Sequence, residues 1–183
     1  GDADVAAARL AELRGRIAMV TQDVQLFRAT VRDNLTLFDP AISDEKVLAS
    51  LEILGLGPWL SSMPDGLDTE LANRGEQLSA GEAQLLAFAR VFLRDPDVVI
   101  LDEASSRLDP ATERLIEQAV ERLLAGRTAM IIAHRLSTIE RVDEVLIIDD
   151  GAVQEHGDRR ELLADPGSRL SRLMKTGLEG VLA

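Results

Sequence analysis

The chain has 183 residues, of which 46% are apolar, and this is enough for one domain with a sizeable core. A formal net charge of −12 repels nucleic acid and anionic lipid headgroups, so neither is expected as a direct partner. The lack of cysteine excludes disulfides and thiolate metal sites and fits a reducing compartment. Residues 1–14 do not have the pattern of a signal peptide, and no apolar run is long enough to span a bilayer.

Four short apolar runs, rich in β-branched residues, are predicted to be strands: Ile17–Val20, Val98–Leu101, Ala129–Ala133 and Val145–Ile148. Their apolar residues do not alternate with polar ones, which is typical of strands buried on both faces. A helix is predicted between the second and third runs, capped by Asp109, with Pro110 in its first turn and Gly126 at its end. Strand–helix–strand at this spacing indicates a parallel sheet with crossover helices.

The stretch Asp23–Pro96 predicts a helical lobe inserted between two strands of the sheet. Its first helix opens at Ser43 and ends at Gly55, and a long helix covers Ala80–Arg94. A loop rich in Pro, Gly and Asp is expected between them, over residues 57–75.

Polar residues lie directly after three of the predicted strands. Gln22 comes after the first strand, Asp102 and Glu103 after the second, and His134 after the third. Because ligands of open parallel sheets bind beyond the carboxyl ends of the strands, we expect these four side chains to meet at one rim of the sheet. An amide, two carboxylates and an imidazole suit a metal–phosphate group and a water molecule.

The pair Asp102-Glu103 is the sharpest of these signals. An aspartate at the end of an apolar strand is a usual holder of Mg²⁺ through its waters in nucleotide sites. The next carboxylate points the other way, where it could orient and deprotonate an attacking water. An isolated pair is more often a solvated acidic turn, but Gln22 and His134 at the neighbouring strand ends favour the chemical role. His156, among charged residues, is predicted to be a surface side chain.

The run Leu78–Glu82 opens the long helix. Ser79 and Glu82 are spaced as a capping box, which explains the motif by itself. Gly81 leaves the first turn bare, and unpaired N–H groups at a helix start attract phosphate, so a γ-phosphate could also dock there.

Five motifs therefore occur in order: Gln22, Leu78–Glu82, Val98–Glu103, Ser106–Asp109 and His134. Together they resemble the Q-loop, signature motif, Walker B strand with catalytic glutamate, D-loop and switch histidine of the nucleotide-binding domain of ATP-binding cassette (ABC) transporters. The resemblance covers nearly the whole chain. It implies an α/β fold of the P-loop NTPase type, with a mainly parallel sheet, crossover helices and an inserted helical subdomain. The implied parts are the end of a catalytic core (1–22), a helical subdomain (23–95), the rest of the core (96–157) and a C-terminal helical tail (158–183).

The resemblance also implies a role for each motif residue. Gln22 and Asp102 would contact Mg²⁺, Glu103 would be the general base, and His134 would hold the γ-phosphate and the attacking water of bound ATP. Ser79 and Gly81 would contact ATP held by an opposite subunit, and Asp109 would link the two sites of the dimer. Four departures stand out: Ala80 where glycine is usual, Glu82 where glutamine is usual, Arg107 where alanine is usual, and Asn73, which interrupts the acidic stretch expected before Arg74.

The flanking segments are similar to the exporter type of this family. They are Thr21–Phe27, Thr30–Leu35, Asn73–Glu76 and the tail from Glu155 to Leu163. In that type the domain is fused to a transmembrane half, so the implied partners are a transmembrane domain and a second ATPase domain. The implied location is the cytoplasmic face of the cell membrane.

One element of the family is not found in the chain. The phosphate-binding loop G-x-x-x-x-G-K-[ST] needs a lysine after a glycine, and the two lysines, Lys46 and Lys175, do not fit it. We therefore expect an incomplete domain that neither binds ATP well nor hydrolyses it alone. Two alternatives remain open: a soluble ABC ATPase unrelated to transport, and a non-catalytic partner that supplies Ser79 and Gly81 to another subunit.

Overall fold

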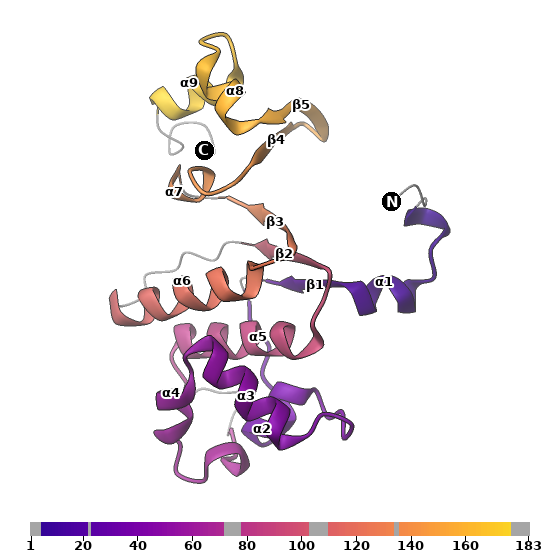
Figure 1. The fold of residues 1–183 in the computed structure, drawn as a ribbon, viewed down its shortest axis with the longest axis vertical. Helices are drawn as coiled ribbons and strands as arrows, with labels where there is room; N and C mark the ends of the chain where they lie inside the picture. Colours follow the sequence, from indigo (N-terminus) through magenta and orange to yellow (C-terminus); the bar gives the residue numbers. More distant parts are fainter. Residues whose placement is uncertain (1–4, 22, 72–77, 103–109, 134–135, 177–183) are drawn as a thin grey trace. The chain divides into compact units, whose positions relative to one another are not determined.

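The computed structural model describes residues 5–21, 23–71, 78–102, 110–133 and 136–176 (Figure 1). The chain divides into two compact units, Gly1–Met130 and Ile131–Ala183. Within the described ranges, no helix is long and apolar enough to cross a membrane. The elements in chain order are the 3₁₀ helix η1 (Val5–Ala7), α1 (Leu10–Arg16), β1 (Ile17–Val20), α2 (Val31–Thr36), α3 (Asp44–Leu54), α4 (Gly57–Ser61), the 3₁₀ helix η2 (Gly66–Asp68), α5 (Ala80–Arg94), β2 (Val98–Asp102), α6 (Pro110–Leu124), β3 (Thr128–Ile132), α7 (Leu136–Ile139), β4 (Glu144–Asp149), β5 (Ala152–Asp158), α8 (Arg159–Ala164) and α9 (Arg169–Thr176).

A three-stranded sheet has the order β1-β2-β3. β1 and β2 run parallel, with Val20 opposite Leu101 at their carboxyl ends. The N–H of Thr128 donates to the carbonyl of Asp97 at 3.2 Å, so β3 starts beside the start of β2. The helix α6 makes the crossover between these two strands. The predicted α/β class with a parallel sheet and crossover helices is therefore confirmed.

The helices α2 to α5 and η2, spanning Val31–Arg94, form what we call the helical lobe. Its central helix α5 contacts α2, α3, α6 and β1 (Figure 1). The apolar residues of α3 recur at the spacing of one helix face, and Val47, Leu51 and Leu54 are all buried. The helices predicted at Ala80–Arg94 and from Ser43 to Gly55 are confirmed.

The loop predicted over residues 57–75 is wrong in its first half, since α4 and η2 lie there. Proline is well suited to the first turn of a helix, because its missing N–H is not needed there, and Pro58 holds that place in α4. Sequence analysis also did not identify α2, a helix of six residues capped by Thr30. Short helices give little periodic signal.

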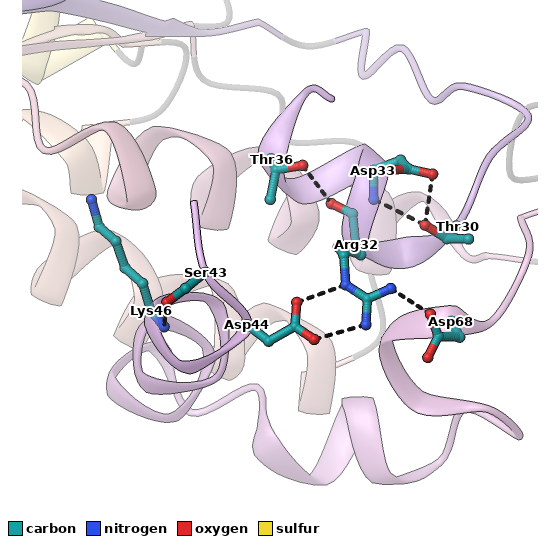
Figure 2. Close-up of polar contacts among 8 residues, drawn as sticks. All are labelled: Thr30, Arg32, Asp33, Thr36, Ser43, Asp44, Lys46 and Asp68. Atoms are coloured by element: carbon teal, nitrogen blue, oxygen red, sulfur yellow. Dashed lines mark hydrogen bonds and ion pairs between the residues drawn. The ribbon is translucent and has the colours of Figure 1, made fainter. Parts of the chain in front are cut away.

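A charged clamp joins three elements of the helical lobe. Arg32 on α2 binds Asp44 at the start of α3 with two hydrogen bonds of 2.6 and 2.8 Å, and it also pairs with Asp68 of η2 (Figure 2). The Arg32 guanidinium holds the pKa of Asp44 below its usual range. The clamp is partly exposed, so its stabilising effect is modest in water.

The second unit contains a β-hairpin. β4 pairs antiparallel with β5, a strand that the sequence analysis did not predict. The two loop residues, Asp150 and Gly151, have φ of 50° and 73°, the geometry of the tight turn that suits the strand twist. An Asp-Gly pair directly after a β-prone run is a turn signal that could have pointed to a second strand at β5. The described part of the expected helical tail contains two short helices, α8 and α9.

The expectation that all four strands are buried on both faces is wrong. β2 follows it in part, with Val99 and Leu101 buried. Met19 of β1, Met130 of β3 and Ile148 of β4 are instead more than half exposed. Absence of alternation in sequence shows which residues can be buried, whereas neighbouring layers decide which ones are.

Candidate functional site

The carboxyl edge of β1 and β2 is the place where the sequence predicts the reaction centre. Because Val20 lies opposite Leu101 in a parallel pair, the chain leaves both strands at the same edge. Asp102, the last residue of β2, is half-buried there. Gln22, Glu103, Asp109 and His134 lie outside the described residues, so the meeting of the four rim side chains remains a prediction. His156 is a surface residue as predicted, 3.1 Å from Glu144.

The start of α5 forms the capping box predicted for it. The Ser79 hydroxyl accepts from the N–H of Glu82 at 3.2 Å, and the Glu82 carboxylate accepts from the N–H of Ser79 at 2.7 Å. The same carboxylate accepts from the Ser79 hydroxyl at 2.8 Å. Gly81 is buried in this first turn. A helix cannot satisfy its own first N–H groups, so this turn still offers donors to an anion.

Asn34, a fully buried residue of α2, makes hydrogen bonds to the segment that follows β1. Its side-chain oxygen accepts from the N–H of Phe27 at 2.8 Å. Its side-chain nitrogen donates to the carbonyls of Phe27 and Thr30, each at 3.0 Å. Sequence analysis did not single out Asn34. A polar residue between the apolar residues Val31 and Leu35 of a short helix is the signal that could have found it.

A cavity of about 260 Å³ lies between β1, the segment after it and α5. Arg90 and Arg94 of α5 line it together with Thr21, Asp23 and Gln25. Burial lowers the pKa of Arg90, and the charge of Arg94 lowers it further. Arg90 is the second residue that sequence analysis missed, since a single arginine within a helix has no special pattern.

The side chains described at the rim supply part of what a magnesium–nucleotide complex needs. Oxygen ligands are the ones that Mg²⁺ prefers, and Asp102 supplies a carboxylate at the rim. Among the described residues, no group of three or more His, Cys, Asp or Glu side chains is placed to hold a metal. A protein site that leaves Mg²⁺ several waters and phosphate oxygens needs only one or two protein ligands.

Comparison with known proteins agrees with this geometry. Residues 1–106 match the family described as ABC transporter. The chain is 44% identical over 158 residues to the uncharacterized ABC transporter ATP-binding protein YknV of Bacillus subtilis, and 45% identical over 158 residues to the ATP-dependent lipid A-core flippase of Burkholderia pseudomallei. Each alignment covers 86% of this chain and 26% of the relative.

The structural comparison gives the same result. The structure of a bacterial Atm1-family ABC exporter with ATP bound matches with a TM-score of 0.81 and 33% sequence identity, over 94% of this chain and 30% of that one. The chain thus spans about a quarter of the length of these curated relatives and a third of the exporter chain. The family match over more than half of its residues, with a parallel sheet and helical lobe that superpose on an exporter, shows that this chain belongs to the ABC transporter family.

Proposed function

We propose that the chain is part of an exporter subunit that binds and hydrolyses ATP to drive a substrate across a membrane. The observation that carries this proposal is the parallel pairing of β1 and β2, with Val20 opposite Leu101. It supports a common rim for Asp102 and for the chain that continues to Gln22. The phosphate-binding loop is not found within the 183 residues, so ATP hydrolysis needs residues from outside them.

In this proposal each motif residue has one task. Bound Mg²⁺ would supply the positive charge that neutralises the transferred phosphate. Asp102 and Gln22 would hold that ion, Glu103 would take the proton of the attacking water, and His134 would orient that water. Ser79 and Gly81, at the start of α5, would meet the γ-phosphate of ATP bound by a second ATPase domain, and Asp109 would lie between the two sites.

The general-base role is tested in the full-length subunit with Glu103→Gln. Loss of a positioned base lowers turnover by about 10²–10⁴-fold, and ATP binding should be unchanged because the substitution keeps the size of the side chain. Glu121→Gln, at an exposed position of α6, makes the same chemical change away from the rim and should retain full activity. Turnover that is unchanged in Glu103→Gln would remove this residue from the base role.

The second ATPase domain is tested by mixing two inactive variants of the full-length subunit, Glu103→Gln and Ser79→Arg. If Ser79 acts on ATP held by the opposite subunit, a mixed dimer contains one intact site, and part of the activity returns. If both residues serve ATP in their own subunit, every site in the mixture has a defect and no activity returns. A transmembrane partner predicts that the full-length subunit fractionates with membranes.

A further inference from the structure

Arg90 links α5 to the segment that follows β1. Its side chain donates three hydrogen bonds: to the carbonyl of Asn34 at 2.6 Å, to the side-chain oxygen of Asn34 at 3.0 Å and to the carbonyl of Gln25 at 2.7 Å. These acceptors are separated from Arg90 by more than fifty residues in sequence. One side chain thus ties together α5, α2 and the segment between β1 and α2.

The geometry of these bonds requires an arginine. The guanidinium presents its donors in a rigid planar fork, and here three different nitrogens of the fork each reach one acceptor. The carbonyl of Asn34 lies in the last turn of α2, where carbonyls have no partner within the helix and a cation is favourable. A lysine keeps the charge but cannot present the fork.

The same segment is held a second time by Asn34. Its side-chain oxygen accepts from both the N–H of Phe27 and Arg90, so one atom connects the segment to α5. Residues 25–30 are therefore fixed on one side by Arg90 and on the other by the Asn34 amide. Of these two connections, only the Arg90 hydrogen bonds come from α5. Their loss therefore removes the direct link between α5 and the segment.

We propose that Arg90 is a positioning residue, which makes the start of the segment after β1 move together with α5. The segment leaves β1 at the edge where Asp102 ends β2, and α5 begins at Ser79. Arg90 thus joins the two regions to which the proposed reaction assigns the metal and the γ-phosphate of the opposite ATP. The catalytic consequence rests on the proposed function, whereas the mechanical link does not.

The mechanical link is tested by hydrogen exchange, read by mass spectrometry, in the full-length subunit. In Arg90→Lys and Arg90→Gln, peptides that cover residues 23–35 should exchange at least about tenfold faster, because Gln25 and Asn34 lose the donor that ties them to α5 and the segment opens more often. Peptides from α3 should keep the wild-type rate. Arg160→Gln, which makes the same kind of change at an exposed position of α8, is the control and should leave both sets unchanged. Unchanged exchange over residues 23–35 would overturn the proposal, and so would an equal increase in α3.

The catalytic consequence is tested by steady-state kinetics of the same variants. Misplacing the segment should lower kcat for ATP by at least about tenfold, with the KM for ATP changed less than about twofold, because the interaction acts on the reacting geometry. Arg90→Lys should resemble Arg90→Gln. A wild-type kcat in both variants, or rescue of exchange and kcat by lysine, would contradict the positioning role. If the wild-type subunit itself hydrolyses no ATP, the proposed function fails, and the exchange experiment still decides whether Arg90 makes the link.

Discussion

The helical lobe and the strands β3, β4 and β5 differ in how they bury their apolar residues. In the lobe, Leu51 of α3 is 1% exposed, and Leu35, Leu54 and Leu85 are equally hidden. In the strands, large apolar residues such as Met130 and Leu146 are about half exposed, and Ile148 is 61% exposed. The helices of the lobe bury their apolar faces on one another, whereas a strand of an α/β sheet needs layers on both faces.

This difference indicates where the stability of the described elements originates. The lobe combines a closed apolar core with a buried polar centre at Asn34, in which the amide is paired. The strands contribute backbone pairing, but several of their large apolar side chains are about half exposed and so gain less burial energy. Substitutions should therefore have large effects in the lobe and small ones on the exposed strand faces.

The largest expected effect comes from Leu51→Ala in the core of the lobe. Removal of a fully buried leucine side chain lowers the free energy of unfolding by about 2–5 kcal/mol, because transfer energy is lost and a cavity is left. Ile148→Ala, at an exposed position of β4, should change it by less than about 0.5 kcal/mol. Urea unfolding followed by circular dichroism measures both. Equal losses in the two variants would show that the strands are as well packed as the lobe.

The next largest effect on stability is expected from Asn34→Leu. The substitution keeps the size of the side chain, but it removes the side-chain partner of both the N–H and the carbonyl of Phe27. Buried groups without partners should lower the free energy of unfolding by about 2–4 kcal/mol. Gln154→Leu, which changes an exposed amide on β5, is the matched control and should be close to neutral. If Asn34→Leu leaves the free energy of unfolding unchanged in the same denaturation experiment, the Asn34 amide does not stabilise the lobe.

A smaller effect is expected at the end of α3. Gly55 has a φ of 77°, and an added Cβ would lie 3.1 Å from the side chain of Arg122. Left-handed backbone is unfavourable for other residues, so Gly55→Ala should lower the free energy of unfolding by about 1–2 kcal/mol. Gly15→Ala in α1 has open space and ordinary helical backbone, so it should be neutral or slightly stabilising. The difference in the free energy of unfolding between the two variants shows whether an added methyl group is tolerated less well in the lobe than in α1, a helix outside it.

The smallest effect concerns the charged clamp and depends on pH. Because Arg32 lowers the pKa of Asp44 below its usual 3.8, the pair stabilises the fold above that value, and this contribution is lost as the pH falls further. Arg32→Gln should therefore be less stable than the wild type at pH 6, and the gap should close below about pH 4. Arg28→Gln, an exposed control, should show the same gap at every pH. Urea unfolding at several pH values is the measurement.

Much of the architecture could be predicted because it follows from local patterns. The helix Ala80–Arg94 has a capping serine, a glutamate at the third position and a continuous apolar stripe, and it is found at the predicted bounds. The strand Ile17–Val20 is also found where an apolar run predicts it. The hairpin partner β5 was missed because only its first two residues, Ala152 and Val153, are apolar, so no apolar run marks it.

The candidate site could be predicted only in part. The order of the motifs is a property of the sequence, and it identifies Ser79, Gly81 and Asp102 as candidates. Arg90 and Asn34 could not be chosen in this way, because their partners are distant in sequence and mostly backbone atoms, which every residue possesses.

The sequence alone determined the family, the class of fold and the bounds of the long helices, since each depends on residue types at fixed spacing. Tertiary structure alone decided which apolar residues are buried and which side chains join α5 to the segment after β1. Burial and hydrogen bonding over more than fifty residues depend on how the chain folds back on itself, and no local pattern specifies the partner.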